Sequence, residues 1–531
     1  MQRRLFLQWT AALALTGCGK LPRLGLPIQV YYPGMQAGHI LRDKPSTSPP
    51  TMRLKVGTVI VGSGIGGLMA AWKLWREGYR DLLLISGPEL GGNAAGGRFG
   101  NIPYPRGAHY LPLPSLESTH IREMLQDVGV IERDAFATHP YYDETAILHG
   151  PEDRLLCNGQ WQDGIMPTHG VDENERMQQQ RFVDQMETLR HAMGADGRRA
   201  FAIPIAQASA DPVWRRLDRL SFKAWLIQQR YTAPSLHWYA NYCCRDDYGA
   251  DYDRISAWAG LHYFAARGGH AANAADGVLL TWPDGLHDLA KKLMARLDPG
   301  CLLAGSAFRL VPTTQGVDAW IQTEDGRTLR IQADHGVCAL PLHVAKHIIP
   351  NLADSGFHPI QHMPLHAPWL VSNFLLDGFP AEPEHAPLAW DNVVYQGRGL
   401  GWVVATHQWI RAAKPEQTVF TAYHALADGE PADTRRWLQK ASADELYELA
   451  ACDLEQAYGW RLRRHLKQLE ITVRGHAMAS PTVGFLDNPG LTALRQGWGR
   501  LHFAHADLSG YSVCEEAAWW GYQAAHRVLA G

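Results

Sequence analysis

Residues 56–78 read VGTVIVGSGIGGLMAAWKLWREG and join a compact apolar run to a glycine-rich turn and then to a stretch with helical periodicity. The apolar run predicts a buried strand, and the apolar residues after the turn recur at the spacing of one helix face. A second apolar run at 81–85 predicts a neighbouring strand. A strand, a Gly-x-Gly-x-x-Gly turn and a helix in this order predict an α/β fold with a Rossmann-like, dinucleotide-binding domain.

The glycines of this turn have separate expected roles. Gly62 permits the tight turn, Gly64 lets the backbone approach a pyrophosphate, and Gly67 lets the helix pack closely on the strand. The pyrophosphate is expected at the helix N-terminus, where free N–H groups and the helix dipole favour an anion. The candidate cofactor-binding residues of the turn are Gly62, Ser63, Gly64, Ile65, Gly66 and Gly67.

The second strand ends in Ser86, where this fold usually carries an acidic residue that accepts hydrogen bonds from a ribose. A neutral hydrogen bond contributes about 0.5 to 1.5 kcal/mol, against about 1.5 to 3 kcal/mol for one to a charged group. Serine at this position is therefore expected to lower dinucleotide affinity, and Glu89 is near enough in sequence to supply a carboxylate instead. Ser86 also leaves NADP open as a ligand, because it would not repel a 2'-phosphate.

Two further stretches resemble segments of FAD proteins. Gly91, Gly92 and Asn93 follow the second strand, and residues 500–529 read RLHFAHADLSGYSVCEEAAWWGYQAAHRVL. Together with the glycine turn they resemble the superfamily of flavin amine oxidases, phytoene desaturases and protoporphyrinogen oxidases. The resemblance implies FAD as the cofactor, with the glycine pair close to its phosphates. It also implies a contact from the terminal turn that holds Asp507 and Gly510 to the ribityl-phosphate region.

The resemblance covers nearly the whole chain after residue 53 and implies two domains. A discontinuous FAD-binding domain is expected to comprise 53–115, 274–345 and 475–531. An inserted α+β substrate-binding domain is expected to comprise 116–273 and 346–474. The resemblance further places a backbone contact to the adenine near Phe308.

The candidate catalytic residues are His109, Tyr110 and Tyr511. The first two lie in YPRGAHYLPLP, where the superfamily's strand passes beside the flavin ring, and Tyr511 falls near an aromatic cage position of amine oxidases. A structural role for His109 is an equal alternative. Many amine oxidases use a lysine near flavin N5, but the region 347–413 contains no lysine, a feature shared with the desaturases.

These features favour an FAD-dependent oxidoreductase in which a small-molecule substrate passes a hydride to flavin N5. An amine or amino acid is the leading substrate class. The alternatives are an FAD-dependent desaturase or isomerase of a lipophilic substrate and a non-catalytic FAD-binding subunit. The sequence has no HExxH zinc motif and no GxSxG nucleophile elbow, so neither a metal site nor a serine hydrolase is expected.

The first eighteen residues, MQRRLFLQWTAALALTGC, predict a targeting signal. Arg3 and Arg4, a short apolar run and Leu-Thr-Gly before Cys18 resemble a twin-arginine signal joined to a lipoprotein cleavage box. The expected partners are therefore the twin-arginine export machinery and a lipid on Cys18, and the expected location is periplasmic and membrane-anchored. Residues 19–52 show little periodicity and predict a tether and an irregular arm.

The composition of the chain excludes some classes of partner and some kinds of covalent framework. The chain has 50 Lys and Arg, 53 Asp and Glu and a net charge of −3, with both signs well mixed, so nucleic acid is not an expected partner. The seven cysteines after Cys18 are scattered and contain no CxxC pair, which argues against a disulfide framework. No stretch after the signal is apolar for long enough to cross a bilayer.

Overall fold

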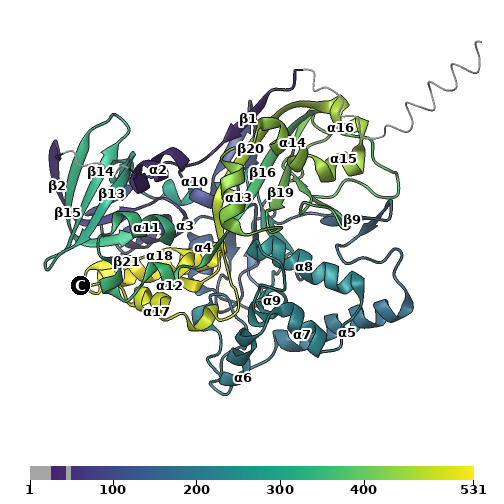
Figure 1. Ribbon diagram of the computed structural model, residues 1–531, viewed down its shortest axis with the longest axis horizontal. Coiled ribbons are helices and arrows are strands. Elements are labelled where there is room, and N and C mark those ends of the chain that lie inside the picture. The colour runs from purple at the N-terminus through teal and green to yellow at the C-terminus, as the bar shows by residue number, and fades with distance from the viewer. Residues whose placement is uncertain (1–24, 44–48) are drawn as a thin grey trace, which may run out of the picture.

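The computed structural model describes residues 25–43 and 49–531, which form two lobes, each built on a large sheet (Figure 1). The predicted signal and Cys18 lie outside the described residues. In the part of the chain that the structure describes, no helix has the length and apolar character needed to span a membrane.

The first lobe contains a seven-stranded sheet with the order β12-β3-β2-β15-β14-β13 and β21 beside β15. Its parallel core joins β2 to β3 and β15, and β15 to β21, whereas β13, β14 and β15 form an antiparallel meander. Its strands are β2 (Met52–Val61), β3 (Leu82–Ile85), β12 (Leu302–Leu303), β13 (Gly305–Pro312), β14 (Val317–Thr323), β15 (Thr328–Cys338) and β21 (Leu501–Phe503). This arrangement confirms the predicted α/β class with a Rossmann-like domain assembled from distant parts of the chain.

Two helices from opposite ends of the sequence pack together on this sheet. Helix α3 (Ile65–Arg76) follows β2, and α18 (Cys514–Leu529) closes the chain. They come within backbone contact, because a Cβ on Gly521 of α18 would collide with the carbonyl of Gly66 in α3. The chain terminus is thereby fixed beside the glycine turn.

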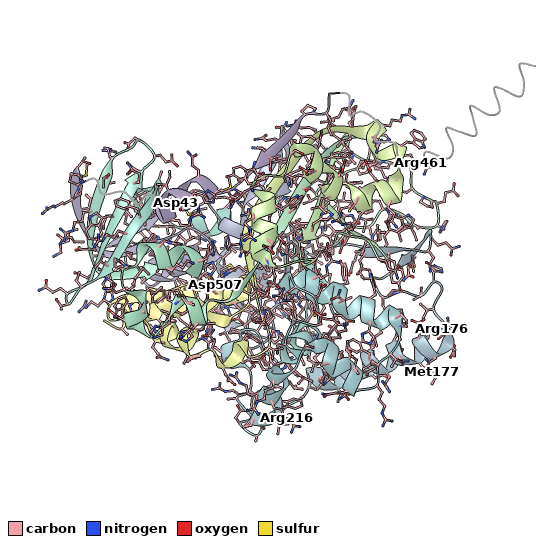
Figure 2. The ribbon with its side chains drawn as sticks, in the orientation of Figure 1. Asp43, Arg176, Met177, Arg216, Arg461 and Asp507 are labelled. Carbon is pink, nitrogen blue, oxygen red and sulfur yellow. The ribbon has the colours of Figure 1, made fainter. Side chains whose placement is uncertain are left out.

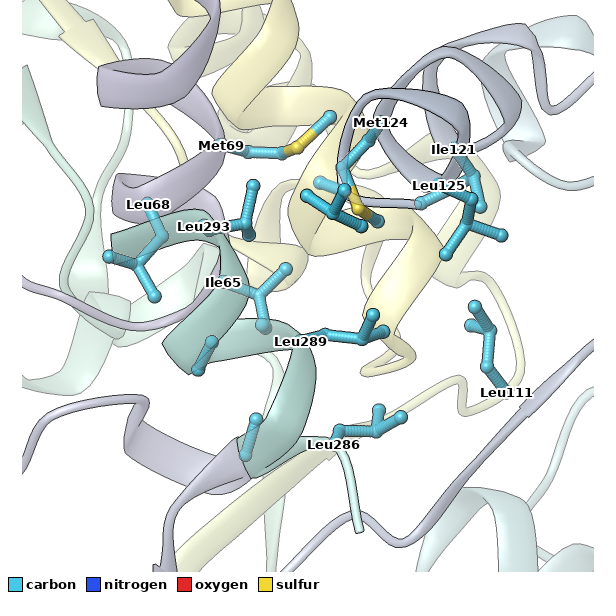
Figure 3. Packing of buried hydrophobic residues seen from close by; sticks show 14 of the residues in the cluster. Ile65, Leu68, Met69, Leu111, Ile121, Met124, Leu125, Leu286, Leu289 and Leu293 are labelled. Atoms are coloured by element: carbon cyan, nitrogen blue, oxygen red, sulfur yellow. The ribbon is translucent and has the colours of Figure 1, made fainter. Parts of the chain in front are cut away.

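The first turns of α3 also pack against α4 (Thr119–Asp127) and α10 (His287–Met294). Figure 3 shows the apolar side chains at this junction, with Leu286 just ahead of α10. Burial of such side chains contributes about 1.5 to 3 kcal/mol each. The labelled members of the cluster are Ile65, Leu68, Met69, Leu111, Ile121, Met124, Leu125, Leu286, Leu289 and Leu293.

The second lobe is built on an eight-stranded mixed sheet with the order β1-β20-β16-β19-β18-β17-β9-β10. Its strands are β1 (Ile28–Tyr31), β9 (Asp153–Cys157), β10 (Gln160–Asp163), β16 (Leu365–Asp377), β17 (Asp391–Val394), β18 (Trp402–Val404), β19 (Gln417–Ala425) and β20 (Leu466–Ser480). The predicted domain boundary at 474–475 falls inside β20, and residues on both sides of it pair with β16 in this sheet.

The remaining elements connect or cover the two sheets. The short strands are β4 (Gly96–Phe99), β5 (Ile102–Pro105), β6 (Tyr110–Pro112), β7 (Ile131–Arg133), β8 (Tyr141–Tyr142) and β11 (Leu279–Thr281). The helices of the middle of the chain are α5 (Glu173–Arg190), α6 (Pro212–Arg215), α7 (Phe222–Gln228), α8 (Pro234–Tyr248) and α9 (Ala257–Ala265). The later helices are α11 (Leu342–Ile348), α12 (Pro359–His362), α13 (Pro431–Leu438), α14 (Ala443–Ala450), α15 (Cys452–Tyr458), α16 (Trp460–His465) and α17 (Pro489–Gln496).

The segment before β2 differs from its prediction as an irregular arm. It contains β1, which pairs in parallel with β20, and the helix α2 (Met35–Asp43), which packs against α11. A nine-residue helix is marginal on its own, so tertiary contacts stabilise it. The local sequence carried little signal for either element because their partners lie hundreds of residues away.

Candidate active site

A cavity of about 820 Å³ lies where the two sheets meet. It is lined by the glycine turn before α3, by residues that follow β3 and β21, by β16, β19 and β20 of the second sheet, and by α2. Its volume is within the usual range for cofactor and ligand sites. One continuous space therefore joins the dinucleotide turn to the second sheet.

The glycine turn leaves room for a phosphate group. Gly62 has a φ of +106°, which residues with a side chain rarely adopt. A Cβ on Gly64 would meet no protein atom within 4 Å, and this residue lines the cavity. By contrast, a Cβ on Gly66 would collide with the Ala504 carbonyl, and one on Gly67 with the Gly62 carbonyl, so these two glycines serve close packing.

The Gly91-Gly92 pair lies directly against this turn. The Gly91 N–H donates to the Ser63 carbonyl at 2.9 Å, and a Cβ on Gly92 would lie 3.5 Å from the Gly64 Cα. Both glycines of the pair have positive φ, +86° and +58°. With Asn93 they line the cavity, beside a helix whose first turn has no acidic residue. The free N–H groups at the start of α3 therefore favour an anion here.

The end of β3 supplies the polar groups expected for a ribose. Ser86 lines the cavity, and so does Glu89 three residues later. Oε2 of Glu89 pairs with Arg474 Nη1 at 3.0 Å, whereas Oε1 of Glu89 has no hydrogen-bond partner. The carboxylate that the strand end lacks is thus present nearby on Glu89.

Asp507 sits between the two lobes (Figure 2), fully buried and lining the cavity. Its Oδ2 accepts hydrogen bonds from the Leu342 N–H at 2.8 Å and from His366 Nε2 at 3.0 Å, while Oδ1 lies 3.3 Å from His505 Nδ1. Burial opposes its ionisation, but His366 and His505 nevertheless hold the pKa of this carboxyl well below its usual range. Asp507 is therefore a fixed negative charge in the wall of the cavity.

Several buried polar atoms of the lining have no partner in the protein. Buried polar groups are nearly always hydrogen-bonded, so such a group marks a place for a polar ligand. Donors and acceptors both occur, which fits a ligand that carries phosphate oxygens as well as hydroxyl groups. The atoms are Glu89 Oε1, His343 Nδ1, Trp369 Nε1, Arg474 Nη2 and Asp507 Oδ1.

An aromatic wall closes another part of the cavity. The His109 ring stacks on Tyr423 at 4.3 Å and contacts Tyr110 edge-on at 5.0 Å. The Tyr423 hydroxyl donates to the Gly107 carbonyl at 3.0 Å and so connects β19 to the segment between β5 and β6. Burial lowers the pKa of His109 to about 3, which keeps its ring neutral near pH 7. His109 and Tyr110 both line the cavity, so the structure places these two candidates together.

Beyond the aromatic wall the lining becomes acidic. Asp246 and Asp247 at the end of α8, Arg267 after α9, and Glu515 in the first turn of α18 all line the cavity. Arg267 pairs with Asp247 at 2.5 Å. Burial, reinforced by Asp247, raises the pKa of Asp246 to about 7, and burial raises the pKa of Glu515 to about 7.

Four predicted site residues lie outside the lining, and the first is Gly67, which packs against the Gly62 carbonyl. Tyr511 is 2% exposed, and its hydroxyl donates to Glu516 inside a helical core, so it does not contact the cavity. Gly510 has a φ of +79° and ends the turn before it, a structural role. Phe308 is buried at a β-bulge of β13, and the lining is formed instead by Ser306 and Ala307 immediately before it.

Comparisons with known proteins agree with this architecture. A family model described as an NAD(P)-binding Rossmann-like domain matches residues 60–128. Putrescine oxidase bound to putrescine superimposes with a TM-score of 0.65 at 17% identity, over 90% of this chain and 100% of that one. The protein has a flavin amine oxidase fold. No curated protein sequence matches the chain.

Other solved structures share the flavin amine oxidase fold with this chain. Cyclohexylamine oxidase from Brevibacterium oxydans IH-35A aligns with a TM-score of 0.59 and 18% identity, over 91% of this chain and 99% of that one. A fatty acid isomerase from P. acnes that produces CLA aligns with a TM-score of 0.56 and 16% identity, over 89% and 98%. At these identities the likeness establishes the fold and leaves the reaction open.

The sequence did not predict the residues of the second lobe that line the cavity of this flavin amine oxidase fold. Tyr423 and Trp369 lie on neighbouring strands, β19 and β16, and Asp246 lies on a helix. Strand β19 is buried on both faces, so the sequence of 417–425 does not show which of its side chains face the cavity. Nothing local distinguishes Asp246 from any other acidic residue at a helix end.

The N-terminal arm forms part of this cavity. Residues between Tyr32 and Arg42 line it, including His39, and none of the residues of α2 is fully buried in protein. The Tyr32 hydroxyl donates to the Leu438 carbonyl and connects the arm to the end of α13. The arm therefore covers the cavity, and apolar side chains of its β1 segment also pack against the core of the second sheet.

We expect a chain that begins at residue 49 to release a bound dinucleotide at least about tenfold faster than the chain with its arm, because a covered ligand must wait for the arm to open. Cofactor release after dilution, followed by fluorescence, measures this rate. Tyr32→Phe, which removes one hydrogen bond and keeps the arm, should change the rate little. Equal release rates with and without the arm would contradict a covering role.

Proposed function

We propose that the protein is an FAD-dependent oxidoreductase of amine oxidase type, in which a substrate C–H bond passes a hydride to flavin N5. The observation that carries the proposal is the continuous cavity, which runs from a phosphate-accepting glycine turn to an aromatic wall. The solved structures with the same fold include two amine oxidases, which supports the reaction class.

The residues of the cavity fit FAD. The free N–H groups of α3 and the guanidinium of Arg474 would hold the pyrophosphate. Ser86 and Glu89 would accept hydrogen bonds from the ribose, and Asp507 Oδ1 from a ribityl hydroxyl. Of these groups, Glu89 Oε1, Arg474 Nη2 and Asp507 Oδ1 have no hydrogen-bond partner in the protein.

When bound, FAD supplies the hydride-accepting centre of the reaction. The protein's own contribution is orientation and exclusion of water. The stacked His109 and Tyr423 rings, held by the Tyr423 bond to Gly107, form a rigid face against which a substrate can lie. Because His109 is neutral, it can accept or donate a hydrogen bond without adding charge.

A lipophilic substrate of a desaturase or isomerase is the second candidate. The fatty acid isomerase with this fold and the lack of lysine in 347–413 favour it. Among the described residues that line the cavity, Lys346 is the one lysine, and it lies on α11 rather than on a strand beside the aromatic wall.

The proposal includes export by the twin-arginine route with a lipid on Cys18, which rests on the sequence of residues 1–18. This route carries folded proteins, so FAD would be bound before export. The proposed location is periplasmic and membrane-anchored.

The visible absorption spectrum of the purified protein tests the proposal. We expect the bands of oxidised flavin, released by heat, and bleaching of these bands by an amine under anaerobic conditions. A yellow protein that amines do not bleach, but that a lipophilic substrate bleaches or isomerises, would favour the second candidate. Flavin that no substrate reduces would indicate a non-catalytic FAD-binding subunit, and a protein that takes up no FAD would overturn the proposal.

A further inference from the structure

The second sheet has one end at which four of its strands start or finish. Strand β16 ends at Asp377, opposite Gln417 at the start of β19. Strand β20 begins at this end with Leu466, and β1 begins there with Ile28, which pairs with β20. The helix α16, which leads into β20, and the loop between β18 and β19 therefore lie at this end of the second lobe (Figure 1).

Contacts across this end join α16 to the loop between β18 and β19. The His465 ring of α16 forms a hydrogen bond with the Asp377 carbonyl at 2.6 Å. The next residue, Gly378, donates its N–H to the carbonyl of Glu416 in the loop at 2.7 Å. One surface thus runs from α16, through the turn after β16, to the loop.

Large apolar side chains are exposed on this surface beside basic ones. Trp460 of α16 is 67% exposed, and Ile410 of the loop is 80% exposed. The arginines and the lysine next to them in the chain are exposed as well. We call this region the docking surface, and its residues are Ile410, Arg411, Lys414, Trp460, Arg461 and Arg464.

The docking surface carries an excess of positive charge. Among the described residues, none of its basic side chains forms an ion pair, whereas Arg463 and Lys467 at the same end each pair with a carboxylate at 3.0 Å. Unpaired carboxylates in the described part of the adjoining segments belong to Glu384 and Glu416. The docking surface is therefore positively charged, although the whole chain has a net charge of −3.

The N-terminal segment enters the fold beside the docking surface. The Leu469 N–H donates to the Pro27 carbonyl at 3.0 Å, which places the start of β1 next to the start of β20. Residues 19–24 separate Gly25 from Cys18, the proposed site of the lipid. An extended chain of that length spans at most about 25 Å. A lipid on Cys18 would therefore keep this end of the second lobe close to a bilayer.

We propose that the docking surface binds an anionic phospholipid membrane and determines which face of the anchored protein turns toward the bilayer. This inference rests on the lipid anchor of the proposed function and names the surface that accompanies it. Tryptophan is favoured at the membrane–water interface, and arginine and lysine are attracted to anionic head groups. A lipid chain and a basic patch act together in membrane attachment, because each adds to the affinity of the other.

The test uses the flavin-loaded chain from residue 19, which keeps every described residue and carries no lipid. It is sedimented with vesicles of phosphatidylcholine alone or with about one-third phosphatidylglycerol, and the protein in the pellet gives the affinity. At about 0.1 M salt we expect the anionic vesicles to bind at least about tenfold more tightly than the neutral ones. This preference should shrink as added salt screens the charges.

Arg461→Gln combined with Arg464→Gln should lower the affinity for anionic vesicles about tenfold to thirtyfold, since each basic residue near such a surface contributes about fivefold. Trp460→Ala should lower it about fivefold, because less apolar area leaves water. Arg461→Lys combined with Arg464→Lys keeps the charge and should keep the binding. Flavin content and melting temperature verify that the variants fold.

Arg216→Gln combined with Arg219→Gln is the matched control for the loss of charge. These two arginines are exposed, have the same spacing in the chain, and form no ion pair among the described residues. Figure 2 shows Arg216 and Arg461 at widely separated places on the molecule. We expect this control pair to bind anionic vesicles as the unmodified chain does.

Equal binding to the two kinds of vesicle, or equal losses in the Arg461/Arg464 and Arg216/Arg219 pairs, would overturn the inference. A chain that binds neither vesicle but dimerises through Trp460 would assign the surface to a second copy instead. The mass of the N-terminal peptide of protein isolated from cell membranes tests the lipid separately. A Cys18 without lipid would refute the anchor of the proposed function, whereas vesicle binding by the unlipidated chain would still support the docking surface.

Discussion

Gly64→Val should abolish retention of the dinucleotide while leaving the protein folded. Gly64 has an ordinary φ of −67°, and a Cβ there would meet no protein atom within 4 Å, so the protein itself tolerates a side chain. The open space beside it is the cavity at the start of α3. A valine would occupy the position from which the helix N–H groups bind phosphate. We expect affinity for FAD to fall at least about a hundredfold, which corresponds to about 2.7 kcal/mol.

Flavin absorbance per chain after purification, together with the melting temperature of the cofactor-free protein, measures this result. Gly66→Ala provides the contrast, because its Cβ would collide with the Ala504 carbonyl and should lower stability by about 1 to 3 kcal/mol even without cofactor. A Gly64→Val protein that kept its full flavin content would show that the pyrophosphate does not lie on this turn.

Glu470→Ala should be among the most destabilising single substitutions in the chain. Glu470 lies on β20 and is 2% exposed. Its two carboxylate oxygens accept hydrogen bonds from Arg106 Nε and Nη2, each at 2.7 Å, and Oε2 also accepts one from the Tyr104 hydroxyl at 2.9 Å. Removal of the carboxylate leaves a largely buried guanidinium without a partner. Loss of one member of a buried pair typically costs about 3 to 5 kcal/mol.

Chemical denaturation followed by tryptophan fluorescence tests this expectation. Asp377→Ala is the matched control, because Asp377 pairs with Lys467 at 3.0 Å at a half-exposed site where an ion pair contributes about 0 to 1 kcal/mol. Similar losses of stability in the two variants would contradict the structural account. If only the Glu470→Ala variant loses stability, it should also retain less flavin. The reason is that Arg106, the partner of Glu470, directly precedes the 107–110 segment that lines the cavity.

The parts of the site that could be predicted were those encoded locally. The glycine turn, the strand before it and the helix after it follow one another in the chain, and the structure places Gly62 to Gly66 on the cavity. The Gly91-Gly92 pair and Asp507 also line it. The positive φ at Gly62 is a conformation that glycine adopts far more readily than other residues, so the residue type itself indicates it.

The N-terminal arm could not be predicted from local pattern. The parallel pairing of β1 with β20 joins Ile28 to Leu469, and the position of α2 over the cavity depends on α11. The nine residues of α2 have too few local interactions to reveal a helix whose support comes from elsewhere. The spacing of apolar residues in a sequence shows which face of a helix or strand is buried. It does not show which other helix or strand packs against that face.

The sequence by itself determined the Rossmann-like class, the glycine turn at the start of α3 and the return of the chain terminus to that turn. Only the tertiary structure decided which side chains of the second lobe face the cavity and placed Tyr511 in a separate core. The physical reason is that backbone preferences act between neighbours in the chain. The charge balance of a cavity depends on groups such as Asp246, Arg267 and Glu515, which only the folded chain brings together.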